Sequence, residues 1–208
     1  MLIKTIPLGY LSANCYIICD ENTKIGAVID PGDCTPELLR IIKSSGIENL
    51  KYIFCTHGHF DHISGVAKLK EIYKDAQVLI GTEDAPALSD ETLSLGKYFG
   101  AFKPCYADRT LKDGDVVELG ETTFRIIATP GHTPGGVLYY SQKDNVVFTG
   151  DTIFKESVGK TTFAGGSASE LMKSLERIKR LPTDCVILSG HGEETTVGHE
   201  LKYNMFLI

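Results

Sequence analysis

Residues 55–62 read Cys55-Thr56-His57-Gly58-His59-Phe60-Asp61-His62 and contain three of the six histidines of the chain. His57 and His59 are two residues apart, so an extended backbone would point both imidazole rings to the same side. Asp61 and His62 stand where the pattern turns helical, and their side chains can approach the same point from a second direction. Neutral imidazole and carboxylate groups together suit zinc, iron or manganese. This stretch therefore predicts a metal site.

The apolar patterns around this stretch predict an α/β fold. In the first half, buried strands are expected at 14–19, 25–29, 50–55 and 77–81. Helices are expected between them, one beginning at Pro36 behind the N-cap Thr35 and ending before Gly46, and another carrying Val66, Leu69 and Ile72 on one face. This alternation of strand and helix is typical of layered α/β domains.

The second half of the chain has the same order of elements, with strands first and then a helix and a final strand. Strands are expected at 116–119, 123–127, 135–140, 145–148 and 185–188, with a helix behind the capping box that begins at Ser167 and a short helix from Val197. Residues 82–109 are less periodic and predict a helix-and-loop excursion that covers the metal end and shapes a substrate pocket. No Pro/Ser-rich linker divides the chain, so we expect residues 1–208 to form a single domain.

Composition excludes several classes of protein. A net charge of −6 disfavours a nucleic-acid groove, which relies on phosphate neutralisation. No apolar stretch approaches the ~18 residues of a membrane span, and the N-terminus lacks the layout of a signal peptide. The six cysteines form no CxxC pair and lie mostly in apolar runs, as small buried residues do in a reducing compartment. We therefore expect a cytoplasmic protein with no nucleic-acid or membrane partner.

Further polar clusters follow three later strands, each in a glycine-rich turn. They contain His132 in 129–136, Asp151 in 149–152 and His191 in 189–192. With the first stretch they make five histidines and two aspartates, more than the three or four ligands of a single zinc. The set matches two metal ions that share one carboxylate. A two-metal site activates water and polarises a carbonyl or phosphoryl oxygen, so the pattern predicts a hydrolase whose nucleophile is water.

The motif His57-x-His59-x-Asp61-His62, followed by His132, Asp151 and His191, resembles the metallo-β-lactamase superfamily almost end to end. The resemblance implies a four-layer αβ/βα sandwich with a dinuclear site at one edge of its two sheets. It implies that His57, His59 and His132 hold metal 1, that Asp61, His62 and His191 hold metal 2, and that Asp151 bridges them. True β-lactamases usually have another residue at the position of His62, so the resemblance does not favour antibiotic hydrolysis.

Within the superfamily, the residues from Gly150 to Phe154 and the pair Gly159-Lys160 are similar to the glyoxalase II-like branch, the hydroxyacylglutathione hydrolases. The resemblance implies that Lys160 binds a carboxylate of the glutathione moiety. The chain departs from the branch in two ways. Thr162 stands where an aromatic residue is common, and the C-terminal helical domain that completes glutathione binding is not expected, as in the short single-domain members.

These features predict thioester hydrolysis of a hydroxyacylglutathione-like substrate by a metal-bridging hydroxide. Asp61 would act both as ligand and as orienter of the hydroxide, and a thiolate with a pKa near ~8.5 would leave with little acid assistance. The cofactors would be two divalent ions, with zinc expected and iron or manganese also compatible. Asp30, Thr56 and Ser189 are candidates for hydrogen bonds to the ligating imidazoles. His199 is not expected to be a ligand.

Other hypotheses about the function remain open. The first alternative is an iron-dependent persulfide dioxygenase of the same superfamily, although its members usually have Arg and Asp where this chain has Lys160 and Thr162. A lactonase or a phosphodiesterase comes third. From a different class, the protein could be a metal-binding scaffold without turnover, which the intact set of seven ligands argues against. The partner is expected to be a small-molecule thioester, and the oligomeric state is left open.

Overall fold

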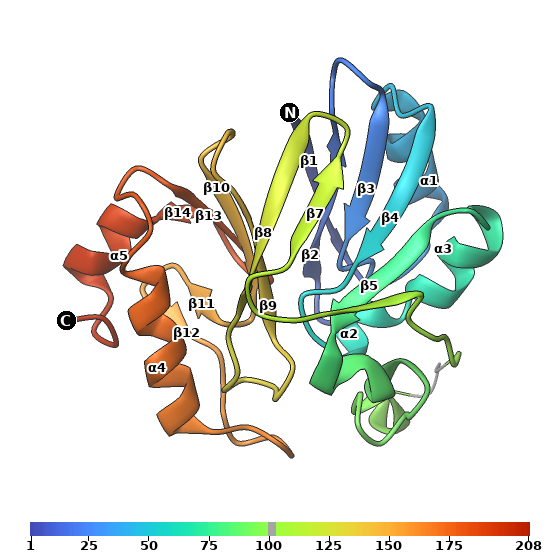
Figure 1. Ribbon diagram of the computed structural model, residues 1–208. Coiled ribbons are helices and arrows are strands. Elements are labelled where there is room, and N and C mark those ends of the chain that lie inside the picture. Colours follow the sequence, from blue (N-terminus) through green and yellow to red (C-terminus); the bar gives the residue numbers. More distant parts are fainter. Residues whose placement is uncertain (100–102) are drawn as a thin grey trace.

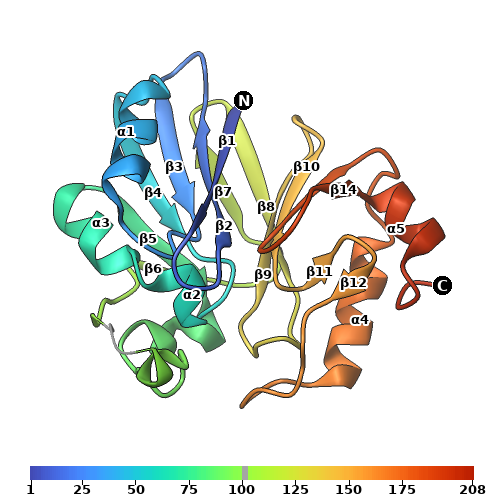
Figure 2. The same ribbon diagram turned by 180° about the vertical axis from the view of Figure 1, so that it is seen from behind.

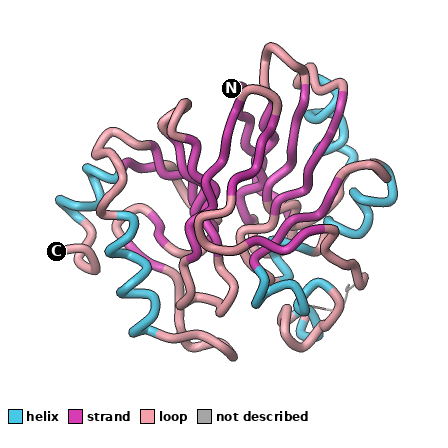
Figure 3. Tube along the Cα trace, viewed as in Figure 1, coloured by secondary structure: helices cyan, strands magenta, loops and turns pink. Residues whose placement is uncertain are grey.

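Two six-stranded β-sheets pack face to face, and helices cover the outer face of each sheet (Figure 1). This computed structural model describes residues 1–99 and 103–208. Seen from behind, the two halves of the chain form the two halves of the sandwich (Figure 2). The strands lie at the centre and the helices at both outer sides (Figure 3). The predicted four-layer αβ/βα sandwich is confirmed.

The first sheet has the order β1-β2-β3-β4-β5-β6. Its first two pairs are antiparallel, and its last three pairs are parallel. The elements of this half are β1 (Leu2–Leu8), β2 (Ala13–Cys19), β3 (Ile25–Ile29), α1 (Pro36–Ser44), β4 (Asn49–Phe54), α2 (Phe60–Ile63), α3 (Val66–Ile72), β5 (Gln77–Gly81) and β6 (Arg109–Leu111).

The second sheet has the order β14-β13-β10-β9-β8-β7, and only β10 and β13 in it pair in parallel. The elements of this half are β7 (Val116–Leu119), β8 (Thr122–Ala128), β9 (Val137–Ser141), β10 (Val146–Gly150), β11 (Ile153–Phe154), β12 (Ser157–Val158), α4 (Ala168–Ile178), β13 (Val186–Ser189), β14 (Thr195–Thr196) and α5 (Val197–Tyr203).

Three apolar layers hold the four structural layers together. One lies between the sheets and contains Phe54, Phe124 and Tyr139, with the Phe54 and Tyr139 rings stacked at 4.6 Å. A second layer packs α1 and α3 against the first sheet, and a third packs α4 and α5 against the second sheet. Burial of apolar surface on both faces of each sheet explains why β4 and β10 are apolar along most of their length.

The predicted helix starts are confirmed in atomic detail. Thr35 Oγ1 accepts a hydrogen bond from the Leu38 amide at 3.1 Å, and Ser167 Oγ accepts one from the Glu170 amide at 3.3 Å. Both side chains satisfy amides that have no partner within the helix. Among the described residues, no helix has the length and apolar character needed to cross a membrane.

The segment 82–109 forms an excursion beside the first sheet, as expected. It contains the 3₁₀ helices η1 (Thr82–Leu88) and η2 (Gly96–Tyr98) and returns to the sheet at β6. Residues 100–102 of this segment lie outside the described part of the chain.

Asp20 ties the two sheets together at the end remote from the histidines. Its Oδ1 accepts hydrogen bonds from the Thr23 amide at 2.9 Å and from the Asn22 amide at 3.1 Å. Its Oδ2 accepts one from the Glu121 amide, in the β7–β8 turn, at 3.0 Å. These bonds, led by that of the Thr23 amide, outweigh the effect of burial and lower the pKa of Asp20 to about 2.

The lowered pKa gives a pH-dependent prediction for Asp20→Asn. An unfolded aspartate has a pKa of about 3.9, so the carboxylate stabilises the fold fully above about pH 4 and loses this effect as the pH falls toward 2. We expect Asp20→Asn to lower the free energy of unfolding by about 1 kcal/mol at pH 7 and by progressively less below pH 4. Urea unfolding from pH 7 to pH 3 checks this, with the exposed Asp75→Asn as control. A difference that stays constant with pH would contradict it.

Candidate metal centre

Four strand ends meet at one edge of the sandwich, and each of them brings polar side chains to the same place. Residues 55–62 follow β4, and the last of them form the short helix α2. His132 lies after β8, Asp151 directly after β10, and His191 shortly after β13. The structure therefore brings together all seven residues that the sequence pattern singled out.

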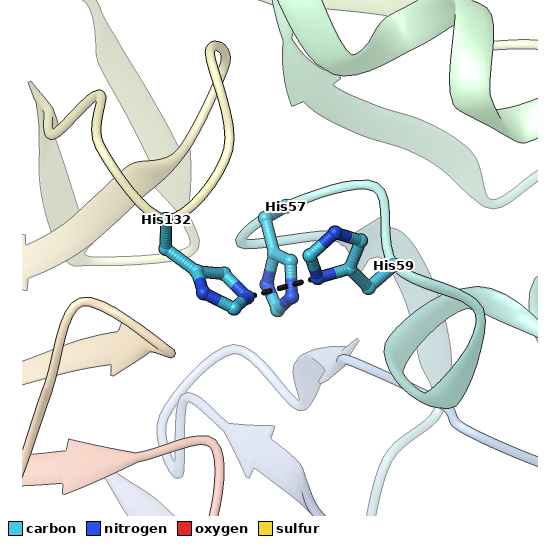
Figure 4. Close-up of side chains that lie close together, drawn as sticks. All are labelled: His57, His59 and His132. Atoms are coloured by element: carbon cyan, nitrogen blue, oxygen red, sulfur yellow. Dashed lines mark hydrogen bonds between the residues drawn. The ribbon is translucent and has the colours of Figure 1, made fainter. Parts of the chain in front are cut away.

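His57, His59 and His132 form the first cluster (Figure 4). Their facing nitrogen atoms all lie within 4.8 Å of one another, and His59 Nδ1 is 2.8 Å from His132 Nε2. All three side chains are buried. Three converging imidazoles are a ligand set that zinc, iron and other transition metals accept.

Asp61, His62 and His191 form the second cluster, also within 4.8 Å. His191 Nε2 lies 3.3 Å from Asp61 Oδ2, and His62 Nε2 lies 3.6 Å from the same oxygen. Asp61 and His62 belong to α2, and this short helix brings both of them close to His191 in the loop after β13. The His62 ring also lies against that of His57, with centroids 4.2 Å apart.

Asp151 lies between the clusters. Its Oδ2 is 3.6 Å from His132 Nε2 of the first cluster and 3.7 Å from His191 Nε2 of the second. Its Oδ1 is 3.3 Å from His62 Nε2. One carboxylate thus has an oxygen within reach of both clusters, which is the position that a bridging ligand requires.

Three buried atoms at this centre have no hydrogen-bond partner among the described residues: His57 Nε2, His62 Nε2 and Asp151 Oδ1. Buried polar atoms are nearly always satisfied in folded proteins. All three of these atoms face the interior of the two clusters. The His/Asp clusters therefore fit the binding of divalent metal ions.

Asp30, at the end of β3, orients two of the imidazoles. Its Oδ2 lies 3.0 Å from His62 Nδ1 and accepts a 2.6 Å hydrogen bond from Thr56 Oγ1. Since that hydroxyl proton is committed to Asp30, His57 Nδ1 donates its proton to Thr56 Oγ1, 3.1 Å away. Both imidazoles therefore carry a proton on Nδ1 and turn Nε2 toward the clusters. Although Asp30 is near the ligand atoms of His57 and His62, its oxygens are occupied by these bonds.

The backbone of Lys160 fixes which ring nitrogen of His132 faces the first cluster. The Lys160 carbonyl accepts a 2.7 Å hydrogen bond from His132 Nδ1, which leaves His132 Nε2 free for the cluster. The preceding residue has to be glycine, because a Cβ on Gly159 would lie 1.8 Å from the Asp151 carbonyl oxygen. The Gly159-Lys160 pair therefore acts on the centre through its backbone as well as through the lysine side chain.

Burial and charge act differently on the two clusters. Burial, reinforced by the neighbouring imidazoles, holds the pKa of His57 well below its usual range, and burial lowers the pKa of His59 to about 4. Burial by itself would lower the pKa of His62, but the carboxylates of Asp151 and Asp61 outweigh burial and raise this pKa well above its usual value. His57 and His59 are thus held as neutral imidazoles, the form that binds metal. In the second cluster a metal ion would displace the proton of His62.

Neither Ser189 nor His199 bonds to a clustered imidazole: the prediction for Ser189 is wrong, and His199 was not expected to be a ligand. The hydroxyl of Ser189 was a candidate partner for an imidazole, but it is buried without a hydrogen bond to any described residue. Its carbonyl instead accepts bonds from Tyr16 Oη at 2.6 Å and Asn14 Nδ2 at 3.0 Å, because β13 presents this carbonyl to β2. His199 takes no part in either cluster and lies 2.9 Å from Glu156.

Sequence reasoning missed Asp84. This buried residue lies just after β5, and its Oδ2 accepts a 2.8 Å hydrogen bond from the Gly58 amide. Its Oδ1 accepts a 2.6 Å bond from the Gly135 amide. Asp84 thus joins the segment of His57 and His59 to the loop of His132. The available signal was its place after a strand, the same place that marked the ligands.

Sequence reasoning also missed Phe163. Thr162 replaces the aromatic residue that was expected two positions after Lys160, but Phe163 follows at once. Its ring centroid lies 5.3 Å from that of His59 and 6.0 Å from that of His132. An aromatic ring therefore flanks the first cluster from a position shifted by one residue.

Comparison with known proteins agrees with this geometry. Residues 8–191 match the family model of the metallo-β-lactamase superfamily. An uncharacterised protein of Aquifex aeolicus is 38% identical, over 99% of this chain and 97% of its own length. The hydroxyacylglutathione hydrolase GloC of Haemophilus influenzae is 34% identical, over 100% of this chain and 98% of its own length.

Solved structures show the same fold. The BLEG-1 B3 metallo-β-lactamase superposes with a TM-score of 0.92 at 33% identity, covering 99% of both chains. TTHA1623 in a di-iron-bound form superposes with a TM-score of 0.87 at 33% identity, covering 98% of this chain and all of the other. ETHE1 from Myxococcus xanthus gives 0.80 at 28% identity, over 99% of this chain and 84% of the other. With its seven clustered side chains, its two-sheet sandwich and these likenesses, the chain belongs to the metallo-β-lactamase superfamily.

Proposed function

We propose that the protein is a dinuclear metallohydrolase that cleaves thioesters in the cytoplasm. The observation that carries the proposal is the place of Asp151 between two three-residue clusters, at the floor of a cavity. The side chains that line this cavity in the described structure include no serine, threonine or cysteine, which supports water as the nucleophile. The likeness to GloC supports a thioester as substrate.

In this proposal, His57, His59 and His132 would hold one divalent ion, Asp61, His62 and His191 would hold the other, and Asp151 would be shared between them. When bound, such ions lower the pKa of a water toward ~7 and polarise a carbonyl oxygen. The likeness to a di-iron-bound protein supports iron beside zinc and manganese as the metal.

Asp61 is placed to orient the attacking water. Burial raises the pKa of this carboxyl, but His62 and His191 outweigh burial and lower it to about 2. Asp61 is therefore ionised across the physiological range and accepts a hydrogen bond from the water while facing the second cluster. The leaving thiolate, with a pKa near ~8.5, needs little proton donation.

The test combines elemental analysis with a substrate panel. We expect about two divalent ions per chain and turnover of S-D-lactoylglutathione or a related glutathione thioester, with loss of turnover after chelation and recovery on metal return. Absence of turnover over the whole thioester panel at full metal loading would overturn the proposal. Asp61→Ala and His62→Ala should abolish turnover, whereas a wild-type protein that binds metal but turns over no member of the panel would be a metal-binding scaffold.

The same preparation tests the competing reactions. Likeness to the BLEG-1 B3 metallo-β-lactamase favours β-lactam hydrolysis as a second candidate, which nitrocefin turnover would reveal. Oxygen uptake with glutathione persulfide would reveal the dioxygenase alternative, and a lactone and a phosphodiester complete the panel. A rate on any of these that exceeds the thioester rate would replace the proposed reaction.

Lys160 gives a separate prediction. Its exposed side chain lines the cavity, where it can pair with a carboxylate of the thiol moiety. Since exposed ion pairs contribute about 1 kcal/mol or less, Lys160→Ala should raise KM for a glutathione thioester roughly fivefold and leave kcat within about twofold. Lys43→Ala, an exposed lysine of α1, removes the same charge as control. Steady-state kinetics of both variants measure the effect, and an unchanged KM would exclude the ion pair.

A further inference from the structure

Apart from the proposed ligands, the cavity beside the clusters is lined almost entirely by apolar side chains. Its volume is about 320 Å³, and five of its twelve lining residues are proposed ligands. The other lining residues are six apolar side chains and a single cation: Leu11, Phe60, Leu95, Phe99, Phe154, Phe163 and Lys160. No side chain with a hydroxyl or a neutral amide lines the cavity in the described part of the chain.

One wall of the cavity is wholly apolar and comes from the first half of the chain. Leu11 lies in the β1–β2 loop, Leu95 and Phe99 lie in the 82–109 segment, and Phe60 opens α2. The rings of Phe60 and Phe99 stack with centroids 3.9 Å apart, and Tyr10 packs on Phe99 at 5.6 Å. Segments from three places in the sequence therefore build one continuous surface.

Part of this wall is open to solvent, whereas Phe60 is buried. Leu11 is 47% exposed and Phe99 is 42% exposed. Grouped apolar side chains that border a cavity typically mark a ligand site, and they gain free energy when an apolar group displaces water from them. The single cation, Lys160, comes from the other half of the chain, beside Phe163 and His132.

We propose that the acyl group of the substrate is an apolar chain of about four to eight carbons, which packs against Leu11, Phe60, Leu95 and Phe99. This inference rests on the proposed thioesterase function. A hydroxyl on the part of the acyl chain that packs against these four side chains would lose contact with water and find no hydrogen-bond partner among them, which is unfavourable. The lining therefore favours a plain acyl group over the hydroxyacyl group named for GloC, and the anionic thiol extends toward Lys160.

The experiment is a chain-length series on the metal-loaded protein. Acetyl, butyryl, hexanoyl and D-lactoyl thioesters of glutathione share one thiol and differ only in the acyl group. We expect kcat/KM to rise roughly threefold for each methylene buried, so that hexanoyl, with four more methylenes, exceeds acetyl by on the order of 80-fold. D-Lactoyl should fall below butyryl. Equal rates across the series, or a preference for D-lactoyl, would overturn the inference and leave thioester hydrolysis standing.

Variants of the apolar wall test whether the chain-length preference arises from its side chains. Leu11→Ala and Phe99→Ala should each lower the ratio of the hexanoyl rate to the acetyl rate about fivefold or more. Ile72→Ala, a 48% exposed side chain at the end of α3, is the matched control and should change neither rate. An unchanged chain-length preference in both wall variants, with native circular dichroism, would contradict the assignment.

A binding readout separates the two proposals. We expect hexanoate to raise the melting temperature of the metal-loaded protein more than acetate does, and Leu11→Ala to remove the difference. If no thioester turns over but this difference is present, thioester hydrolysis fails and the apolar acyl site stands. If neither is seen, both proposals fail.

Discussion

Replacing Asp151 with alanine is expected to lower kcat/KM for a thioester by roughly a thousandfold and to reduce the metal content from two ions to about one. Of the two clustered carboxylates, Asp151 is the one whose oxygens lie within 4 Å of histidines from both clusters among the described residues. Its removal takes one ligand from each ion, so neither retains a full set. Pre-organised charge at a reacting centre has effects of this size.

Elemental analysis and kinetics on the same preparation measure this result. Asp151→Asn is the informative companion, because it keeps the volume and one neutral oxygen but removes the charge that raises the pKa of His62. We expect it to retain more metal than Asp151→Ala and to remain at least tenfold slower than the wild type. Retention of two ions with nearly full activity in Asp151→Ala would show that the carboxylate does not bridge.

Asp84→Ala is expected to have the largest effect on stability. It leaves the buried amides of Gly58 and Gly135 without their acceptor, and an unsatisfied buried donor costs about 1–3 kcal/mol. We expect the free energy of unfolding to fall by about 3 kcal/mol. Since the two amides belong to the segments that carry His57, His59 and His132, the affinity of the first cluster for metal should fall 10–100-fold as well.

Urea unfolding and a competition titration with a chromophoric chelator measure the two effects separately. Asp84→Asn keeps one acceptor oxygen and should lose about half as much stability. The exposed Asp75→Ala, which removes the same charge, is the control. A purely structural role would lower stability without changing metal affinity in the folded protein, and that outcome would refute the coupling between Asp84 and the metal centre.

The sequence by itself determined the identity of the candidate ligands and the class of fold. Metal ions bind imidazole and carboxylate groups, and the recurrence of such groups after four separate strands, as at His57, Asp151 and His191, marks the site in the sequence. Alternating apolar strands and capped helices likewise predict the layers, because the spacing of apolar residues along an element shows whether one or both of its faces are buried.

Only the tertiary structure decided how these side chains are held and what surrounds them. Asp84 reaches Gly58 and Gly135 across 26 and 51 residues of sequence, and no local pattern marks such a contact. The choice of ring nitrogen in His57 and His62 depends on Asp30, and that in His132 on the Lys160 carbonyl. The apolar wall is likewise assembled from separate segments. Periodicity reports burial along one element, whereas a site wall is a surface shared by several elements, so its composition appears only when the chain is folded.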